Sequence, residues 1–190
     1  MHDPSCGSVL KSQVQTVMLT TTRRRHGQKV RLKDVDMKTL NPAYVSAVAG
    51  VVNLSPYFAL LSMEIRSLGW GESLLEIKVQ QKHLQPFGMV HGGVYSSLVD
   101  AAAFWAVYTQ VDQGQGMTTV ELKLNFLAPS SAGRLIAKGR SLRLGKTLGL
   151  SEASVEDERG NLLAHGTSTT MILGNLNIDG ESGLPPKFLD

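Results

Sequence analysis

The most regular pattern of apolar and polar positions lies in TTVELKLNFLAP, residues 118–129. Successive side chains of a strand point to opposite faces of a sheet, so this period of two predicts a half-buried β-strand. Residues 133–145, 146–160 and 161–173 predict three more strands, and the turn sequence Glu-Arg-Gly-Asn joins the last two into a hairpin. In the first strand the apolar positions are Val120, Leu122, Leu124 and Phe126, which alternate with Glu121, Lys123 and Asn125.

The residues before this region predict two short helices and two strands. Asn41 is a suitable N-cap for a helix with Pro42 at its first position, and apolar residues at helical spacing extend it over 42–52. A Ser-Pro pair further on repeats this arrangement before a shorter helical piece. The segment MEIRSLGWGESLLEIKVQ, residues 63–80, alternates on both sides of Gly-Trp-Gly and predicts two strands joined by that turn.

The most apolar segment is FGMVHGGVYSSLVDAAAFWAVY, residues 87–108, in which Asp100 is the only acid or base besides His91. It predicts a helix over about 92–110, between the two early strands and the four later ones. This order predicts an α+β fold in which a curved antiparallel sheet wraps around one long central helix. Either the sheet curls around the helix or a second subunit covers it, and both arrangements would bury Asp100.

Length and composition predict one domain with a tail at each end. The 190 residues, 42% of them hydrophobic, can form one sizeable core but not two comfortable ones. We expect a domain over 39–174, a basic disordered extension over 1–38 and a turn-rich, flexible tail over 175–190. No apolar run reaches membrane-spanning length, so no membrane segment is expected.

The net charge of +3 is unevenly distributed along the chain. Residues 1–40 contain eight Lys or Arg and three acids, a balance of +5, which leaves −2 for the remaining 150 residues. The domain itself therefore gives no electrostatic reason to expect DNA or RNA as a partner.

The composition of the N-terminal residues indicates the cellular location of the protein. Residues 1–38 are too polar for a secretory signal, and Cys6, the single cysteine, excludes an intramolecular disulfide. A cytoplasmic location is the simplest interpretation. The segment is rich in Ser, Thr and Arg and poor in acids, so an organellar transit peptide is an alternative, although a disordered extension is favoured. Translation that begins at Met37, where the globular pattern starts, is a third hypothesis.

Asp100 needs an explanation because an isolated carboxylate is strongly disfavoured in apolar surroundings. On its own helix the nearest preceding neighbours are Ser96 and Ser97, and no Lys or Arg occurs in residues 83–122. A local salt bridge is therefore excluded. Asp100 is either a structural acid with a partner from a distant strand or an acid that takes part in chemistry.

The tripeptide His91-Gly92-Gly93 directly precedes the same helix. Two glycines at a helix start leave backbone N–H groups unshielded, and the helix dipole adds partial positive charge, which suits a carbonyl oxygen or an anion. Alternatively, the glycines only permit a tight turn, and His91 could fix that turn, act as a base or pack. No other His, Cys or acid lies at ligand spacing, so we expect no metal.

The distance between these two features has a consequence for assembly. Gly92 and Asp100 are eight residues apart, which corresponds to about 12 Å along a helix. The two groups of one chain cannot easily reach the same reacting carbon. If the protein is an enzyme, Gly92 of one subunit has to act with Asp100 of another, and an obligate homo-oligomer is expected.

The segment HLQPFGMVHGGVYSSLVDAAAFW resembles hot-dog-fold acyl-CoA thioesterases of the phenylacetate-pathway type, and the resemblance extends from about Pro42 to Leu173. It includes SPYFALLSMEIRSLGWGESLLEIKV before the motif and the strand-rich residues 118–169 after it. In that family an antiparallel sheet wraps around the long helix, and dimers join two sheets edge to edge. The resemblance implies an acyl-CoA substrate, no cofactor, and a homodimer or homotetramer with active sites between subunits.

The resemblance also implies a role for individual residues. The backbone N–H of Gly92 would bind the thioester carbonyl, and Asp100 would act as nucleophile or as general base toward water. Gln85 would position the thioester or the water. Thr119, or its neighbour Thr118, would assist the carboxylate.

Other residues carry weaker assignments. His91 would support the loop more than transfer protons. Phe104 shares a helix face with Asp100 and either lines an acyl pocket or belongs to the core. The residues assigned to substrate binding are Gly93, Phe104, Arg140, Arg143 and Lys146. The three basic ones occupy positions where relatives bind the phosphates of coenzyme A, although exposed basic residues on a strand are also typical of a solvated face.

The sequence leaves other functions open. A non-catalytic acyl-CoA-binding or regulatory module on the same fold is the main alternative. A dehydratase or hydratase has less support, because it needs a different spacing of histidine and acid. Two features depart from the family: relatives often carry glycine where this chain has Ser62, and the basic extension has no counterpart. The acyl group and the choice between dimer and tetramer are not predicted.

Overall fold

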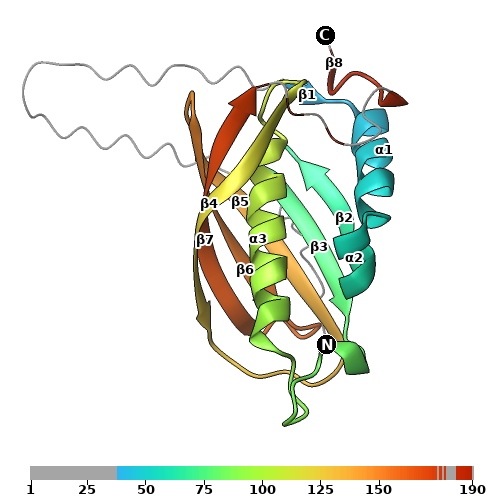
Figure 1. Ribbon diagram of the computed structural model, residues 1–190, viewed down its shortest axis with the longest axis vertical. Helices are drawn as coiled ribbons and strands as arrows, with labels where there is room; N and C mark the ends of the chain where they lie inside the picture. Colours follow the sequence, from blue (N-terminus) through green and yellow to red (C-terminus); the bar gives the residue numbers. More distant parts are fainter. Residues whose placement is uncertain (1–37, 175, 177, 179–182, 190) are drawn as a thin grey trace, which may run out of the picture. The chain divides into compact units, whose positions relative to one another are not determined.

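The computed structural model describes residues 38–174, 176, 178 and 183–189 (Figure 1). The expected N-terminal extension lies outside these residues, except for Lys38. Helices and main strands follow the predicted order, and the boundaries of the two longer helices agree with those predicted to within two residues. In chain order the elements are β1 (Thr39–Leu40), α1 (Pro42–Asn53), α2 (Pro56–Leu61), β2 (Met63–Gly69), β3 (Glu72–Lys78), the short 3-10 turn η1 (Gln81–His83), α3 (Gly92–Tyr108), β4 (Gln115–Phe126), β5 (Arg134–Leu144), β6 (Leu148–Glu156), β7 (Leu162–Gly174) and β8 (Phe188–Leu189).

Six of these strands form one antiparallel sheet in the order β2-β3-β5-β6-β7-β4. Figure 1 shows the sheet curving around α3, with α1 packed beside β2. The structure confirms the predicted α+β fold, a curved antiparallel sheet wrapped around one long central helix. None of the helices that the structure describes has the length and hydrophobicity to span a bilayer.

Glycines in the sheet let α3 lie unusually close to it. A methyl group at Gly139 of β5 would lie 2.1 Å from the carbonyl oxygen of Ala102, and one at Gly149 of β6 would lie 2.5 Å from Val107 Cγ1. The same carbonyl oxygen of Ala102 accepts a hydrogen bond of 2.7 Å from the buried Ser73 hydroxyl of β3. Packing of this kind leaves no room for a side chain at either glycine, so the glycines fix how close α3 lies to the sheet.

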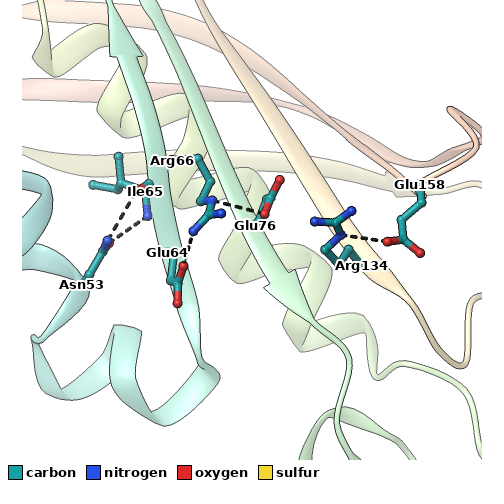
Figure 2. Close-up of polar contacts among 7 residues, drawn as sticks. All are labelled: Asn53, Glu64, Ile65, Arg66, Glu76, Arg134 and Glu158. Carbon is teal, nitrogen blue, oxygen red and sulfur yellow. Dashed lines mark hydrogen bonds and ion pairs between the residues drawn. The ribbon is translucent and has the colours of Figure 1, made fainter.

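The two edges of the sheet are treated differently. At β2, the Asn53 amide accepts a hydrogen bond from the Ile65 N–H at 2.7 Å and donates to its carbonyl oxygen at 3.3 Å, so a side chain occupies the place of a neighbouring strand (Figure 2). Beside it, Arg66 bridges Glu64 and Glu76 on the outer face. At the other edge, β4 pairs with β7 and, among the described residues, with no second strand. A long open edge strand of this kind is a template for pairing with another chain.

Among the described C-terminal residues, a short strand and a buried lysine contact the domain. β8 pairs with β1, and the Lys187 side chain is 1% exposed. Its ammonium group donates to the carbonyl oxygens of Tyr108 and Val111 at 2.6 Å each. Tyr108 is the last residue of α3 and Val111 lies three residues beyond it, so the ammonium group sits at the C-terminal end of the helix, where the dipole favours a cation. Residues 183–189 therefore contact the domain through β8 and the Lys187 side chain.

Ser62 ends α2 in the left-handed region, with φ of 49°. This is the position at which relatives often carry glycine, and the backbone explains why, since glycine adopts this conformation without strain. The serine hydroxyl accepts a hydrogen bond from Lys82. The departure from the family is thus a local matter of helix termination.

Candidate active site

The Asp100 carboxylate lies midway along α3 and accepts a hydrogen bond from β4. The Thr119 hydroxyl donates to Asp100 Oδ1 at 2.8 Å. Within the described residues Asp100 has no ion-pair partner. The residue is half-buried in the single chain, because it lies on the wall of an open pocket.

A β-bulge is what brings Thr119 to the carboxylate. Thr119 pairs with Thr170 of β7, but the next paired residue is Glu121, so Val120 is left out of the ladder. A bulge of one residue reverses the alternation of faces. Thr119 and Leu122 therefore both point toward α3, whereas Val120 is 51% exposed. The sequence prediction of a strict alternation with Val120 on the buried face is wrong at this point.

The pocket beside Asp100 has a volume of about 620 Å³ and mainly apolar walls. Phe104, which was expected to line an acyl pocket or the core, is part of this wall and stacks on Tyr108 with ring centroids 6.2 Å apart. Helix α2 supplies the opposite wall, and β4 the third. Its main apolar lining residues are Phe58, Met63, Phe104, Trp105, Tyr108 and Met117.

Two hydroxyl groups of this pocket were not singled out from the sequence. Tyr57 of α2 and Ser97 of α3 lie 2.7 Å apart, and Ser97 donates to the carbonyl oxygen of Gly93. Because the Ser97 proton is used in that bond, the Tyr57 hydroxyl donates to Ser97. The pair ties α2 to α3 near Asp100. The Ser-Pro signal predicted α2 as a helix, but nothing in the sequence indicated which surface it covers.

The start of α3 presents a backbone donor. His91 is its N-cap, and its Nδ1 accepts a hydrogen bond of 2.9 Å from the Gly93 N–H. The Gly93 N–H therefore donates to the N-cap side chain, whereas the Gly92 N–H is at the first helical position, where no intrahelical acceptor exists. A methyl group at Gly92 would lie 3.1 Å from the Phe126 ring, so a larger residue there requires only a small shift of the exposed Phe126 side chain. The structure gives His91 a loop-supporting contact.

Gln85 lies in the loop that leads to this helix start. Its side-chain oxygen accepts a hydrogen bond from the Phe87 N–H at 3.0 Å, which holds the side chain against the loop. Gln85, Gly92 and Tyr95 line one hollow of about 380 Å³. Burial raises the pKa of the Tyr95 hydroxyl.

The structure does not bring the two halves of the expected site together in one chain. The hollow at Gly92 and the pocket at Asp100 have no lining residue in common. Gly92 begins α3 and Asp100 lies eight residues later, a rise of about 12 Å. Asp100 and Thr119 form one cluster, and Gln85, His91 and Gly92 form the other.

The basic residues expected near coenzyme A lie elsewhere on the single chain. Arg140 points to the outer face of the sheet, opposite to Gly139, and its Nε donates to Glu152 at 3.0 Å. The hydrogen bond from Arg140 is the main cause of a lowered pKa of Glu152. Arg143 and Lys146 are exposed and line a separate hollow of about 350 Å³ at the turn between β5 and β6.

One further histidine is structural. His83 is 1% exposed, accepts the Gln80 N–H at Nδ1 and donates from Nε2 to the Leu61 carbonyl oxygen. Burial lowers the pKa of its imidazole, and nearby Lys82 lowers it further. This neutral ring connects the end of α2 to the loop that carries Gln85.

Similarity to other proteins fits this geometry. Residues 87–164 match the model of the thioesterase superfamily. A protein of Saccharolobus solfataricus whose name classes it with the esterases is 32% identical over 133 residues, which cover 70% of this chain and 88% of its own length. The chain belongs to the thioesterase superfamily. Membership places it among the thioester hydrolases as a class.

A second relative and a solved structure are also similar to this chain. The 1,4-dihydroxy-2-naphthoyl-CoA hydrolase of Listeria monocytogenes is 30% identical over 103 residues, which cover 54% of this chain and 84% of that protein. The structure of the Escherichia coli PaaI protein from the phenylacetic acid degradation operon superposes with a TM-score of 0.62 at 21% identity, covering 68% of this chain and 93% of PaaI. The expected hot-dog fold is therefore confirmed.

Proposed function

We propose that this thioesterase hydrolyses acyl-CoA thioesters in sites that combine Asp100 of one subunit with Gly92 of another. The observation that carries the proposal is the half-buried Asp100 carboxylate, held by Thr119 on the wall of an otherwise apolar pocket. The CoA ester as substrate class is supported by the relative named as a naphthoyl-CoA hydrolase. A cytoplasmic site of action is part of the same proposal.

Asp100 can serve the reaction in two ways. As a general base it takes a proton from water while the water oxygen attacks the thioester carbon, and the proton then goes to the leaving CoA thiolate. As a nucleophile its oxygen attacks the same carbon, CoA leaves as thiolate, and water hydrolyses the resulting anhydride. In both routes the carbonyl oxygen becomes negatively charged, and the Gly92 N–H at the helix start stabilises it.

Assembly through the β4 edge would complete the site. β2 is closed by Asn53 and α1, whereas the outer edge of β4 pairs with no strand in the part of the chain that the structure describes. The strand also exposes apolar side chains, among them Val120 at 51% and, beside Gly92 and Tyr95, Phe126 at 58%. Pairing of two β4 strands would bury these residues, and we expect a dimer whose two active sites lie between subunits. Arg143 and Lys146 are available for coenzyme A phosphates in such a dimer.

The test is thiol release from acyl-CoA by the purified full chain. Asp100→Asn should lower kcat by about 10²–10⁴-fold, the usual contribution of a positioned acid or base, and leave acyl-CoA binding intact. Asp112→Asn is the matched control, because Asp112 is exposed and pairs with Lys38. Wild-type rates in Asp100→Asn would refute the role of Asp100. Binding of acyl-CoA without any thiol release by the wild type would favour the non-catalytic module.

Mixing two inactive variants tests the shared site. Gly92→Pro removes the N–H at a helix position that tolerates proline, so this variant should be inactive alone. In a mixed dimer of Asp100→Asn and Gly92→Pro subunits, one site receives an intact Gly92 and an intact Asp100. Mixing should therefore restore activity that neither variant shows by itself. If no mixture recovers activity although subunit exchange is demonstrated, the two-subunit site is wrong.

A further inference from the structure

The Asp100 pocket has a polar end and an apolar end. Asp100 and the hydroxyls of Ser96 and Ser97 lie at one end, and Trp105 and Tyr108 lie about one and two turns further along α3. Among the described residues that line the pocket, Asp100 is the only one that carries a formal charge at neutral pH. An acyl group with a second charge at its far end would find no counter-ion there, and burying such a charge is strongly unfavourable.

The apolar end is closed by residues that follow the sheet. Leu176 and Ile178 line the pocket after β7 has ended. The Leu176 side chain rests directly on the backbone of Gly116 in β4: a methyl group at Gly116 would lie 2.7 Å from Leu176 Cβ and 2.8 Å from its Cγ. Ile178 packs against the hydrophobic core. The end wall therefore depends on a glycine in β4 and on two residues outside the sheet.

Lys187 anchors the same end of the helix. Its ammonium group holds the carbonyl oxygen of Tyr108, and lies 3.8 Å from the centroid of the Tyr108 ring. The Tyr108 hydroxyl forms a hydrogen bond of 3.0 Å with the Tyr44 hydroxyl. Tyr108 is thus fixed at its carbonyl group, ring face and hydroxyl, which makes it a rigid floor for the end of the pocket.

We propose that Leu176 and Ile178 set the upper size limit of the acyl group, and that the preferred substrates carry uncharged acyl chains of about ten carbons. The inference rests on the proposed acyl-CoA thioesterase function. Asp100 and Tyr108 are eight residues apart, about 12 Å along α3. An extended chain advances about 1.2 Å per bond, by the reckoning of 3.3–3.6 Å for the three bonds of a residue, so about ten bonds reach the end wall.

The experiment measures kcat/KM by thiol release for straight-chain acyl-CoA esters from butanoyl to hexadecanoyl. The wild type should prefer octanoyl and decanoyl. Leu176→Ala opens the wall and should raise the dodecanoyl-to-octanoyl ratio by about tenfold, the gain from burying about two more methylenes. Ile178→Ala should act in the same direction, and Leu176→Phe should move the preference to shorter chains. Leu189→Ala is the matched control, since Leu189 is 49% exposed, close to the 47% of Leu176, and does not line the pocket.

The outcomes separate this inference from the proposed function. Suppose that the wild type hydrolyses acyl-CoA and that Leu176→Ala, Ile178→Ala and Leu176→Phe all keep its chain-length profile. Then Leu176 and Ile178 do not limit the acyl length, and the thioesterase function stands. A wild-type preference for hexadecanoyl-CoA also overturns the size limit. If no acyl-CoA is hydrolysed, the proposed function fails, and binding of non-hydrolysable acyl-CoA thioethers of the same lengths still tests the wall. The same shift of preference in affinity supports it, and unchanged affinities refute it.

Discussion

Thr119→Val isolates the hydrogen bond that the β4 bulge creates. Valine matches threonine in shape and suits a strand, so the substitution removes the donor to Asp100 with little change in packing. A hydrogen bond to a charged group contributes about 1.5–3 kcal/mol, which corresponds to about 10- to 150-fold in rate. Asp100 is half-buried and open to the pocket, so water can replace part of the lost bond. We therefore expect kcat to fall by about 10- to 30-fold.

Steady-state thiol release measures this effect. kcat should fall with KM nearly unchanged, because the lost contact stabilises the reacting carboxylate and not the bound ground state. Thr119→Ser keeps the hydroxyl and should retain most of the activity. Thr118→Val makes the same change at the adjacent, exposed position and should behave as the wild type. If Thr119→Val and Thr118→Val have equal activity while both remain folded, the bond between Thr119 and Asp100 does not contribute to turnover.

Two further predictions concern stability. Gly139→Ala places a methyl group 2.1 Å from the Ala102 carbonyl oxygen, which overpacks the core and disrupts the buried hydrogen bond to that oxygen. Urea unfolding should show a loss of about 2–6 kcal/mol in the free energy of unfolding. Gly174→Ala, with open space around it, should change this free energy little. Burial lowers the pKa of His83 in the folded state, so the unfolded chain binds a proton first as the pH falls through about 6.5. Below that pH the free energy of unfolding should therefore fall by up to about 1.4 kcal/mol per pH unit. His83→Gln should remove this part of the pH dependence, and an identical dependence in both proteins would contradict the assignment.

Much of the fold follows from local pattern. Asn41 and Pro42 start α1 as predicted, and the Asn41 side chain accepts the Ala43 N–H at 3.0 Å. The period of two along β5, β6 and β7 appears directly in their burial, because one face of each strand packs on α3. These features depend on neighbouring residues, and a single sequence therefore contains enough information to predict them.

Contacts between distant segments were outside the reach of such patterns. The closure of the pocket by Leu176 is one example, and the burial of Lys187 against the end of α3 is another. A lysine in a stretch rich in proline and glycine looks like a solvated residue, and its two carbonyl acceptors lie more than seventy residues earlier in the chain. Only the course of the chain after β7 places them together.

The sequence by itself determined that Asp100 and Gly92 lie on one helix about 12 Å apart, since helical rise is a property of the backbone alone. It did not determine the partner of Asp100. A regular strand would have turned Thr119 away from α3, and only the bulge at Val120 reverses the faces of β4 and directs the hydroxyl to the carboxylate. Strand register is set by pairing with β7 and by packing against α3, so the tertiary structure decided which hydroxyl the acid receives.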